Sequence, residues 1–386
     1  MSAGAHPGVP AARRESAPAP PWIERRLAAR PDVVAAVLVA LGLLARLRAA
    51  NAPFLQPDEV LHFRIASAST AAATYRYSLT NAHPPLFYFL LRGWRHVAHS
   101  DWALRLLPVA FGTAFLWSAW RWAAGALGRA CGLVTLACLA FLPSIVLVTS
   151  EVRGYALLLW AMASGLWALE DALETGSAGR LWLSTALFAV ALATHYSALL
   201  FLGGAFVYAA VRIASGRQSR ALGLHWAAGQ ALLGALAAFF DVTHIRHLHG
   251  GPLEAEVQST WLQESFRRGG QGAAAFLASR TLSLFQYFFS TRAGGAVGVV
   301  LFLGGVAWLA ARRRPVAILL TLPFVLAAAG GLLAVYPYGG TRHDVALGLF
   351  AYAGTGVAFA RLTGERLWAA VAVAAALVVS GFLVSG

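Results

Sequence analysis

The run VVAAVLVALGLLARLRAA, residues 33–50, decides the fold class of this chain. A helix needs about 20 predominantly apolar residues to cross the hydrocarbon core of a bilayer, and this run supplies nearly that many. The rest of the chain has the same character, because 59% of its 386 residues are hydrophobic and only 12% are charged. A soluble domain has roughly twice that charged share, so we predict an all-α polytopic membrane protein.

We predict a bundle of about eleven transmembrane helices, each formed by an apolar run of adequate length. Two of these runs are almost continuous and require a tight turn at Tyr196–Ser197. The predicted spans are 33–50, 103–121, 131–149, 155–172, 181–196, 198–213, 221–240, 295–311, 316–335, 343–361 and 367–385.

The segment Pro84–Val97 is apolar but too short to span, so we predict a juxtamembrane helix there. With this segment on one side of the membrane, the Arg clusters of the short tails and loops fall on the other, as the positive-inside rule expects. We therefore predict a cytoplasmic N-terminus, with residues 1–32 as a disordered tail and 33–386 as the membrane domain. The large loops 51–102 and 241–294 are then external.

Every basic residue is Arg, and the formal net charge is +14. A surface for nucleic acid is one interpretation of this charge. Membrane proteins, however, place such charge in cytoplasmic loops and beside anionic headgroups, so we expect membrane lipids and no nucleic acid as partners. An Arg-only chain rich in Ala and Gly indicates a GC-rich bacterial genome. We therefore predict a multi-pass protein of the bacterial plasma membrane.

Titratable side chains gather at the predicted external face. Nine of the eleven histidines and nine of the sixteen acidic residues lie in external loops or at external helix ends. Such a gathering suggests a reaction or binding centre, although external loops are also simply the hydrated parts of a membrane protein.

The first cluster is QPDEVLHF, Gln56–Phe63. Asp58 and Glu59 are adjacent carboxylates at the membrane boundary, where an ionised group needs a purpose or a partner. On a helix they point about 100° apart, so one can face a site while the other supports it. His62 lies three residues after Glu59 and can share its face of the helix. Alternatively, Asp58 could be a helix N-cap after Pro57.

Other clusters offer groups for an anionic ligand. His83 precedes a Pro–Pro helix start whose free N–H groups suit an anion. Arg153 in SEVRGY could pair with Glu151, or its guanidinium could hold a phosphate through several fixed donors. Lipid headgroups are an alternative partner for such arginines. Arg105 and Arg342 are further candidates for binding a donor phosphate. The candidate substrate-binding residues are His62, His83, Glu151, His195, Tyr196 and His343.

The segment DVTHIRHLH contains three candidate metal ligands, His244, His247 and His249. Their spacing could present two or three imidazoles to a divalent ion, with Asp241 nearby. A His-rich loop without a metal is the alternative, because no closed ligand set is evident. We therefore predict no certain cofactor, and a divalent metal only as an open alternative.

The order of these motifs resembles the GT-C superfamily of polyprenyl-phosphate-sugar-dependent glycosyltransferases, in particular its protein O-mannosyltransferase and aminoarabinose transferase branch. An Asp–Glu pair and a His-Pro-Pro-Leu helix start share the first external loop. The motifs at Arg105–Pro108, Glu151–Tyr155 and Thr194–Tyr196 follow. The resemblance covers most of residues 33–361. His83 stands where the aminoarabinose transferases typically have Lys, which leaves the acceptor open.

The resemblance implies that Asp58 acts as the general base, that Arg105 helps to bind the donor and that Arg342 contacts the lipid phosphate. We predict an inverting transfer of a sugar from a polyprenyl-phosphate donor to a hydroxyl of a glycan, lipid or protein acceptor. Partial burial at the bilayer edge would raise the pKa of Asp58 and strengthen it as a base. Arg105, Arg153 and Arg342 would stabilise the departing phosphate, and Glu59 would assist catalysis.

Two other classes of function are open. A transporter or flippase of a lipid-linked or anionic substrate would place polar groups deep within its spans, whereas here they gather at one end. A non-catalytic scaffold of the cell envelope would tolerate any change at Asp58.

Overall fold

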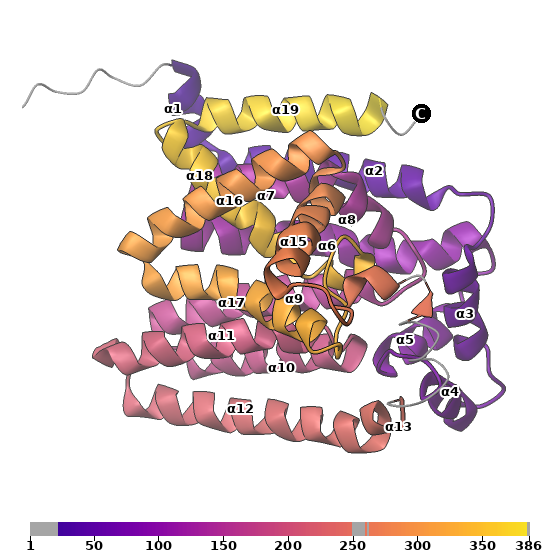
Figure 1. The fold of residues 1–386 in the computed structure, drawn as a ribbon. Helices are drawn as coiled ribbons and strands as arrows, with labels where there is room; N and C mark the ends of the chain where they lie inside the picture. The colour runs from indigo at the N-terminus through magenta and orange to yellow at the C-terminus, as the bar shows by residue number, and fades with distance from the viewer. Residues whose placement is uncertain (1–21, 249–258, 261, 384–386) are drawn as a thin grey trace, which may run out of the picture.

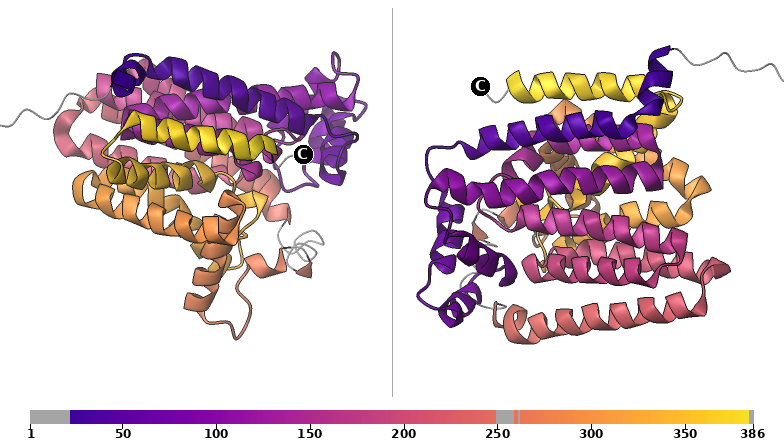
Figure 2. Two further views of the ribbon diagram at one scale, coloured as in Figure 1. Left: turned by 90° about the horizontal axis from the view of Figure 1, so that it is seen from above. Right: turned by 180° about the vertical axis from the view of Figure 1, so that it is seen from behind.

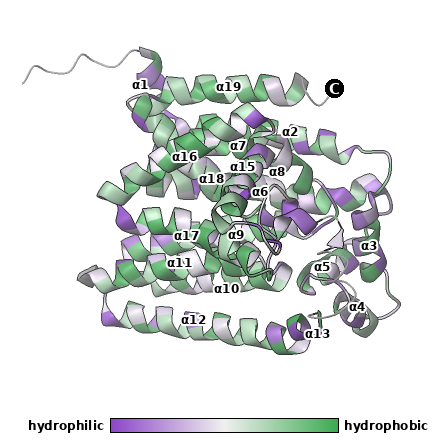
Figure 3. Ribbon diagram, in the orientation of Figure 1, coloured by the Kyte–Doolittle hydropathy of each residue, from purple (hydrophilic) through white to green (hydrophobic). Residues whose placement is uncertain are grey.

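The computed structural model describes residues 22–248, 259–260 and 262–383. The described residues form helices and no strand, and most of the helices lie side by side along one direction (Figure 1). Hydrophobic residues cover these helices along their length, and polar residues are concentrated towards the ends (Figure 3). A helix satisfies its own backbone groups, so such a bundle suits the bilayer, and the predicted fold class is confirmed.

Within the described residues, seven helices are long and apolar enough to cross a membrane, and four shorter apolar helices accompany them. These eleven, seven plus four, match the eleven predicted spans. The long ones are α2 (Pro31–Ala50), α6 (Asp101–Leu127), α9 (Tyr155–Thr175), α11 (Ala198–Arg212), α12 (Arg220–Phe240), α16 (Arg292–Arg312) and α17 (Arg314–Leu332). The shorter ones are α7 (Arg129–Phe141), α10 (Ala178–Thr194), α18 (Leu347–Leu362) and α19 (Leu367–Leu383).

The core of the bundle is formed around α7, α9 and α18. Nearly every residue of these three helices is buried, and α7 packs against α2, α6, α18 and α19. α9 packs between α6 and α10, and the pair α11 and α17 and the pair α16 and α18 complete the bundle. The turn predicted at Tyr196–Ser197 is present between α10 and α11.

The segments outside the spans differ in part from the prediction. Trp22–Ala29, placed in the predicted tail, forms the helix α1, while residues 1–21 lie outside the described residues. The predicted loop 241–294 contains the helix α15 (Ala273–Phe289), which stands at a steep angle to the bundle (Figure 2). α18 begins at Leu347, because a short 3₁₀ turn precedes it.

The third predicted span is broken in two. Pro143 has no N–H, so the carbonyl of Leu139 loses its helical partner, and the chain continues as the short helix α8 (Pro143–Val148). Arg46 of α2 compensates for this loss. Its Nη2 donates to the Leu139 carbonyl at 3.0 Å, and its Nη1 donates to the Ala140 carbonyl at 3.4 Å. The fully buried Arg46 thereby ties α2 to the break in α7.

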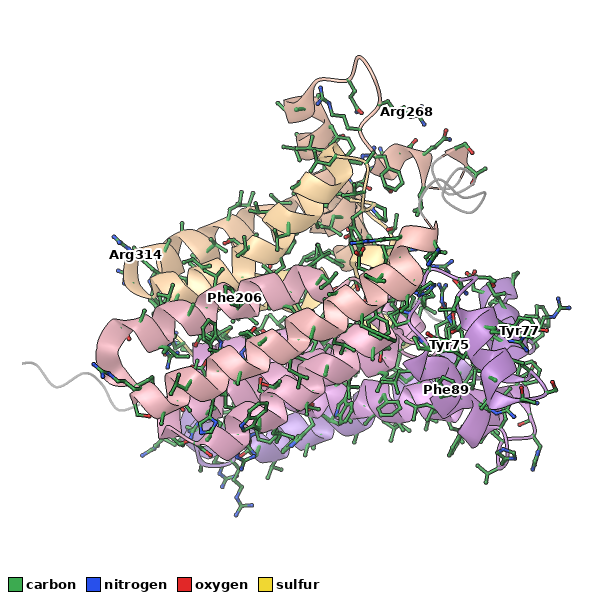
Figure 4. All side chains as sticks on the ribbon, turned by 90° about the horizontal axis from the view of Figure 1, so that it is seen from below. Tyr75, Tyr77, Phe89, Phe206, Arg268 and Arg314 are labelled. Carbon is green, nitrogen blue, oxygen red and sulfur yellow. The ribbon has the colours of Figure 1, made fainter. Side chains whose placement is uncertain are left out.

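Three short helices, α3 (Pro57–Ala66), α4 (Ala71–Ser78) and α5 (Leu86–Trp94), lie together at one end of the bundle, which we call the loop end (Figure 1). α5 has only 9 residues, too few to span, as predicted for Pro84–Val97. Tyr75 and Phe89 lie at the loop end, and Arg314 lies at the opposite end (Figure 4).

The bond between Arg46 and the broken helix yields a stability prediction. Arg46→Leu should lower the free energy of unfolding by roughly 1–3 kcal/mol for each carbonyl left without a donor. Thermal unfolding of the purified protein measures this change. Arg64→Gln is the control, because Arg64 is exposed on α3. Equal stability of the two variants would contradict the assigned role of Arg46.

Candidate active site

The first turn of α3 sends Asp58 and Glu59 in different directions. Gln56 is the N-cap residue, Pro57 occupies the first helical position, and Glu59 accepts a hydrogen bond from the Gln56 N–H at 2.9 Å. Asp58 does not cap the helix, so that alternative is wrong. Its carboxylate is instead directed to other parts of the chain.

Glu59 and Arg105 form a buried ion pair with exposed fractions of 1% and 2%. Arg105 Nε and Nη2 donate to the two Glu59 oxygens at 2.9 and 2.7 Å, which is a bidentate arrangement. Its remaining donors reach the carbonyl oxygens of Ala50, Ala52 and Phe54 at 3.3, 2.8 and 2.8 Å. The pair therefore fixes the connection between α2 and α3.

This arrangement corrects two predictions. All five donors of Arg105 have protein acceptors, so its guanidinium is not available to a donor phosphate. Glu59 is buried and both of its oxygens accept hydrogen bonds from the protein, an arrangement that favours a positioning role over the predicted catalytic one. It also accepts from the Val152 N–H at 2.8 Å, which ties α3 to the connection between α8 and α9. The two segments that carry Asp58 and Arg153 are thereby held together.

Asp58 lies between two arginines that are far from it in sequence. Arg153 Nη1 donates to Asp58 Oδ2 at 3.0 Å, and Arg342 Nη2 contacts the same oxygen. The Arg153 side chain is buried at 5% exposure, whereas Arg342 and Asp58 are 31% and 41% exposed. The structure thus brings three predicted site residues together at the loop end, where the carboxylate is accessible.

The turn that presents Arg342 is held by groups that sequence reasoning missed. The buried Asp344 accepts from the Gly339 N–H at 2.9 Å, and Tyr336 donates from its hydroxyl to the carbonyl of His343 at 2.7 Å. Gly340 is required here, because a Cβ would lie 2.5 Å from the Ser283 carbonyl oxygen. The motif YPYGGTRHD, Tyr336–Asp344, contained this signal in its double glycine and its single acidic residue, Asp344.

Burial acts to raise the pKa of Asp58, but Arg153 and Arg342 outweigh it and hold the pKa below its ordinary value. The expected net rise of the Asp58 pKa is therefore wrong, because the two arginines lower the pKa by more than burial raises it. A carboxyl with a depressed folded-state pKa adds stability above its unfolded pKa of 3.8, and this contribution is lost as the pH falls through the lower folded value. Asp58 is ionised at neutral pH.

Beside Asp58 lies a cluster of imidazole and phenol rings. The ring centroids of His83 and His195 are 4.6 Å apart, those of His62 and His83 5.5 Å, and those of Tyr155 and His195 5.0 Å. Burial lowers the pKa of His62 to about 4, and lowers the pKa of His83 and of His195 well below the usual value. All three imidazoles are therefore neutral at physiological pH.

This ring cluster has spare hydrogen-bonding capacity. Among the described residues, no partner contacts His83 Nδ1, His195 Nε2 or the hydroxyl of Tyr88, and all three atoms are buried. A cavity of about 10 Å³ lies against them, room for one water molecule. Tyr88 was not predicted, because within an apolar run it is indistinguishable from a core aromatic residue.

Glu151 and His343 lie near Arg153 and Arg342, but the carboxylate partner of both arginines is Asp58. Glu151 does not pair with Arg153, whose carboxylate partner is Asp58, so the predicted alternative is wrong. Burial raises the pKa of Glu151. Burial, followed by the charges of Arg153 and Arg342, lowers the pKa of His343 to about 3.

The predicted metal ligands do not form a site within the described part of the chain. The hydroxyl of Tyr196 lies 2.5 Å from Nδ1 of the buried His244, which ties the α10–α11 turn to the segment after α12. His247 is exposed, and His249 lies outside the described residues. Among the described residues no group of three or more His, Cys, Asp or Glu side chains is arranged to hold a metal.

Comparisons with known proteins give a family match for part of the chain and similar folds among solved structures. Residues 82–243 match the family model described as dolichyl-phosphate-mannose-protein mannosyltransferase. The fold is similar to that of ArnT from Cupriavidus metallidurans in the apo state, with a TM-score of 0.53 and 17% identity over 88% of this chain and 62% of that one. It is also similar to an Archaeoglobus fulgidus oligosaccharyltransferase tethered with an acceptor peptide containing the NVT sequon, with a TM-score of 0.51 and 10% identity over 91% of this chain and 55% of that one.

The chain spans about three fifths of the length of ArnT and about half of that of the oligosaccharyltransferase. No curated protein matches it in sequence. The predicted resemblance is confirmed: the chain is a multi-pass membrane protein with the GT-C fold, and its residues 82–243 match the mannosyltransferase family model.

The buried Glu59–Arg105 pair predicts non-additive stability changes. Glu59→Gln and Arg105→Met should each lower the free energy of unfolding by about 3–5 kcal/mol, because each leaves a buried group uncompensated. The double variant should lose less than the sum of the two. The control is the pair Arg246 and Asp241, which is 66% and 41% exposed and whose removal should cost about 0–1 kcal/mol. Additive losses in denaturant unfolding would argue against a coupled pair.

Proposed function

We propose that the protein transfers a sugar from a polyprenyl-phosphate donor to an acceptor hydroxyl at the outer face of the plasma membrane. The observation that carries this proposal is an accessible carboxylate, Asp58, held between Arg153 and Arg342 at the loop end of the bundle. The family match of residues 82–243 and the GT-C fold support glycosyl transfer at a membrane as the type of activity.

Arg153 and Arg342 are the proposed phosphate-binding groups. Two guanidinium groups face one carboxylate, so this cluster keeps one positive charge in excess and attracts an anion. Phosphate oxygens compete with Asp58 for the same donors. When the phosphate takes them, Asp58 loses the cations that lower its pKa, and the carboxylate becomes a stronger base in the presence of the donor.

The reaction follows as a single displacement. The acceptor hydroxyl gives its proton to Asp58 while its oxygen attacks the anomeric carbon. The bond from that carbon to the phosphate oxygen breaks, and polyprenyl phosphate leaves with the electron pair. Arg153 and Arg342 stabilise the negative charge that grows on the phosphate. One displacement inverts the anomeric configuration, and no general acid is required.

The neutral rings beside Asp58 are proposed to bind the sugar or the acceptor. Among the described residues, one ring nitrogen of His83 and one of His195 have no protein partner, and His62 fixes its own ring by a 2.8 Å hydrogen bond to the Asp58 carbonyl. Neutral imidazoles offer one donor and one acceptor each, which suits sugar hydroxyl groups. Glu151, Tyr196 and His343 border the same region and are proposed as further contacts.

The first test is Asp58→Asn. It should lower turnover about 10²–10⁴-fold, because the amide cannot take the acceptor proton. Transfer from a panel of labelled polyprenyl-phosphate sugars measures turnover. Asp241→Asn is a matched control, because Asp241 is also 41% exposed and paired with an arginine at 2.6 Å. Activity of Asp58→Asn at the level of this control would refute the base assignment.

The second test uses the pH profile. The acidic limb of kcat/KM reports the pKa of Asp58 in the free enzyme, which lies below 3.8. Arg342→Gln removes one cation, so the limb should move to higher pH, and the KM for the donor should rise. If neither the acidic limb nor the KM for the donor changed, Arg342 would have no role at this site.

A transporter of a lipid-linked substrate is distinguished by a different measurement. Counterflow uptake of such a substrate into vesicles, without any glycosyl product, would favour transport over transfer. The described contacts favour transfer, because Asp58 and both arginines lie beyond the spans, in α3 and in loops.

A further inference from the structure

A second cleft lies at the end of the bundle opposite the loop end. It has a volume of about 380 Å³, within the range of small-ligand sites. The first turn of α2, the last turns of α6 and α9 and the first turn of α7 line it. These are helix ends, so the cleft opens at the second membrane–water boundary, on the far side of the bilayer from Asp58.

Two arginines in the lining of the cleft, Arg121 and Arg129, are suited to a phosphate. Arg121 stacks on Trp167 with its guanidinium carbon 4.8 Å from the ring centroid, and within the described residues its N–H groups contact no acceptor. Arg129 uses one nitrogen for a bond of 3.2 Å to the Ala28 carbonyl and has further donors. Arg129 also begins α7, whose N-cap residue Gly128 provides no side-chain cap. The first N–H groups of this helix therefore add a partial positive charge.

One carboxylate in the lining of the cleft, that of Glu174, is suited to an ammonium group. Glu174, in the last turn of α9, is exposed, and none of the residues that the structure describes pairs with it. The C-terminal end of α9 adds a partial negative charge. The other carboxylates of the cleft are already engaged: Asp32 accepts from Trp120 at 2.8 Å, Asp171 pairs with Arg180 at 2.9 Å, and Glu170 pairs with Arg212 at 3.0 Å.

The residues that line the cleft are of the kinds found around lipid headgroups at a membrane interface. Trp120, Trp122 and Trp167 line it, and Trp is the residue typical of the membrane interface. Trp122 is only 1% exposed, and its indole N–H has no acceptor among the described residues, so the cleft wall holds one more unused donor. Next to Asp32 on α2, Val33 and Val37 are 56% and 54% exposed, an apolar face for acyl chains.

We propose that this cleft binds a phospholipid that carries a primary amine, a phosphatidylethanolamine, with its phosphate at Arg121 and Arg129 and its ammonium at Glu174. An anionic lipid without an amine satisfies only the arginines. A choline headgroup has no N–H to donate and depends on aromatic faces, and Arg121 already covers Trp167. The combination of two arginines with an unpaired carboxylate in one cleft therefore selects the amine.

The test is binding of single lipids to the purified full chain in detergent, measured by native mass spectrometry. We expect the first dioleoyl-phosphatidylethanolamine to bind about tenfold more tightly than the phosphatidylcholine or phosphatidylglycerol of the same chains. Arg121→Gln should weaken both the ethanolamine and the glycerol lipid about tenfold. Glu174→Gln should weaken only the ethanolamine lipid, because only that lipid donates to the carboxylate.

Arg220→Gln is the control, since Arg220 is exposed at the start of α12 and does not line the cleft. Both test residues are exposed, so the variants should fold, and size-exclusion chromatography checks this. Equal affinity of the three lipids would overturn the proposal. So would binding by Glu174→Gln like the control, or water-soluble glycerophosphoethanolamine binding as tightly as the lipid.

Discussion

The site depends on one interaction, the buried bidentate pair of Glu59 and Arg105. A buried ion pair is stable only when its remaining hydrogen-bonding groups are satisfied, and here backbone groups from the end of α2, the start of α3 and the connection after α8 provide them. Three chain segments therefore meet at one point. Asp58 is adjacent to Glu59, and Arg153 follows the anchored Val152, so the pair sets the distance between the exposed carboxylate and its buried arginine.

The second constraint is the balance of charge around Asp58. Asp58 is shared by two guanidinium groups, so these three side chains together carry one positive charge in excess, and the histidines nearby do not change it because burial keeps them neutral. An anion can enter without displacing a protein segment. Under the proposed function the same arginines bind the donor phosphate and control the basicity of the carboxylate, which links binding of the donor to activation of the base.

The two ends of the bundle differ in their chemistry. At the loop end, short helices and turns bring arginines, histidines and tyrosines around Asp58, whereas at the opposite end the helix termini themselves line a cleft with charges of both signs. The spans between them are held by packing and by local repairs such as Arg46 at the break in α7. This division places the ionised side chains of both proposed sites at the two membrane boundaries, where water is available to them.

The sequence by itself determined the class of fold, the number of apolar helices and the short non-spanning segment in the first loop, and it singled out Asp58, Arg153 and Arg342, which the structure brings together. Hydrophobic length is a local property, so it can be read without coordinates. Only the tertiary structure decided which acid faces the site, because Glu59 differs from Asp58 by one position and a rotation of about 100° on the helix. It also reassigned Arg105, reversed the expected pKa shift of Asp58 and separated His244 from a metal role, because each depends on partners more than 40 residues away in the chain.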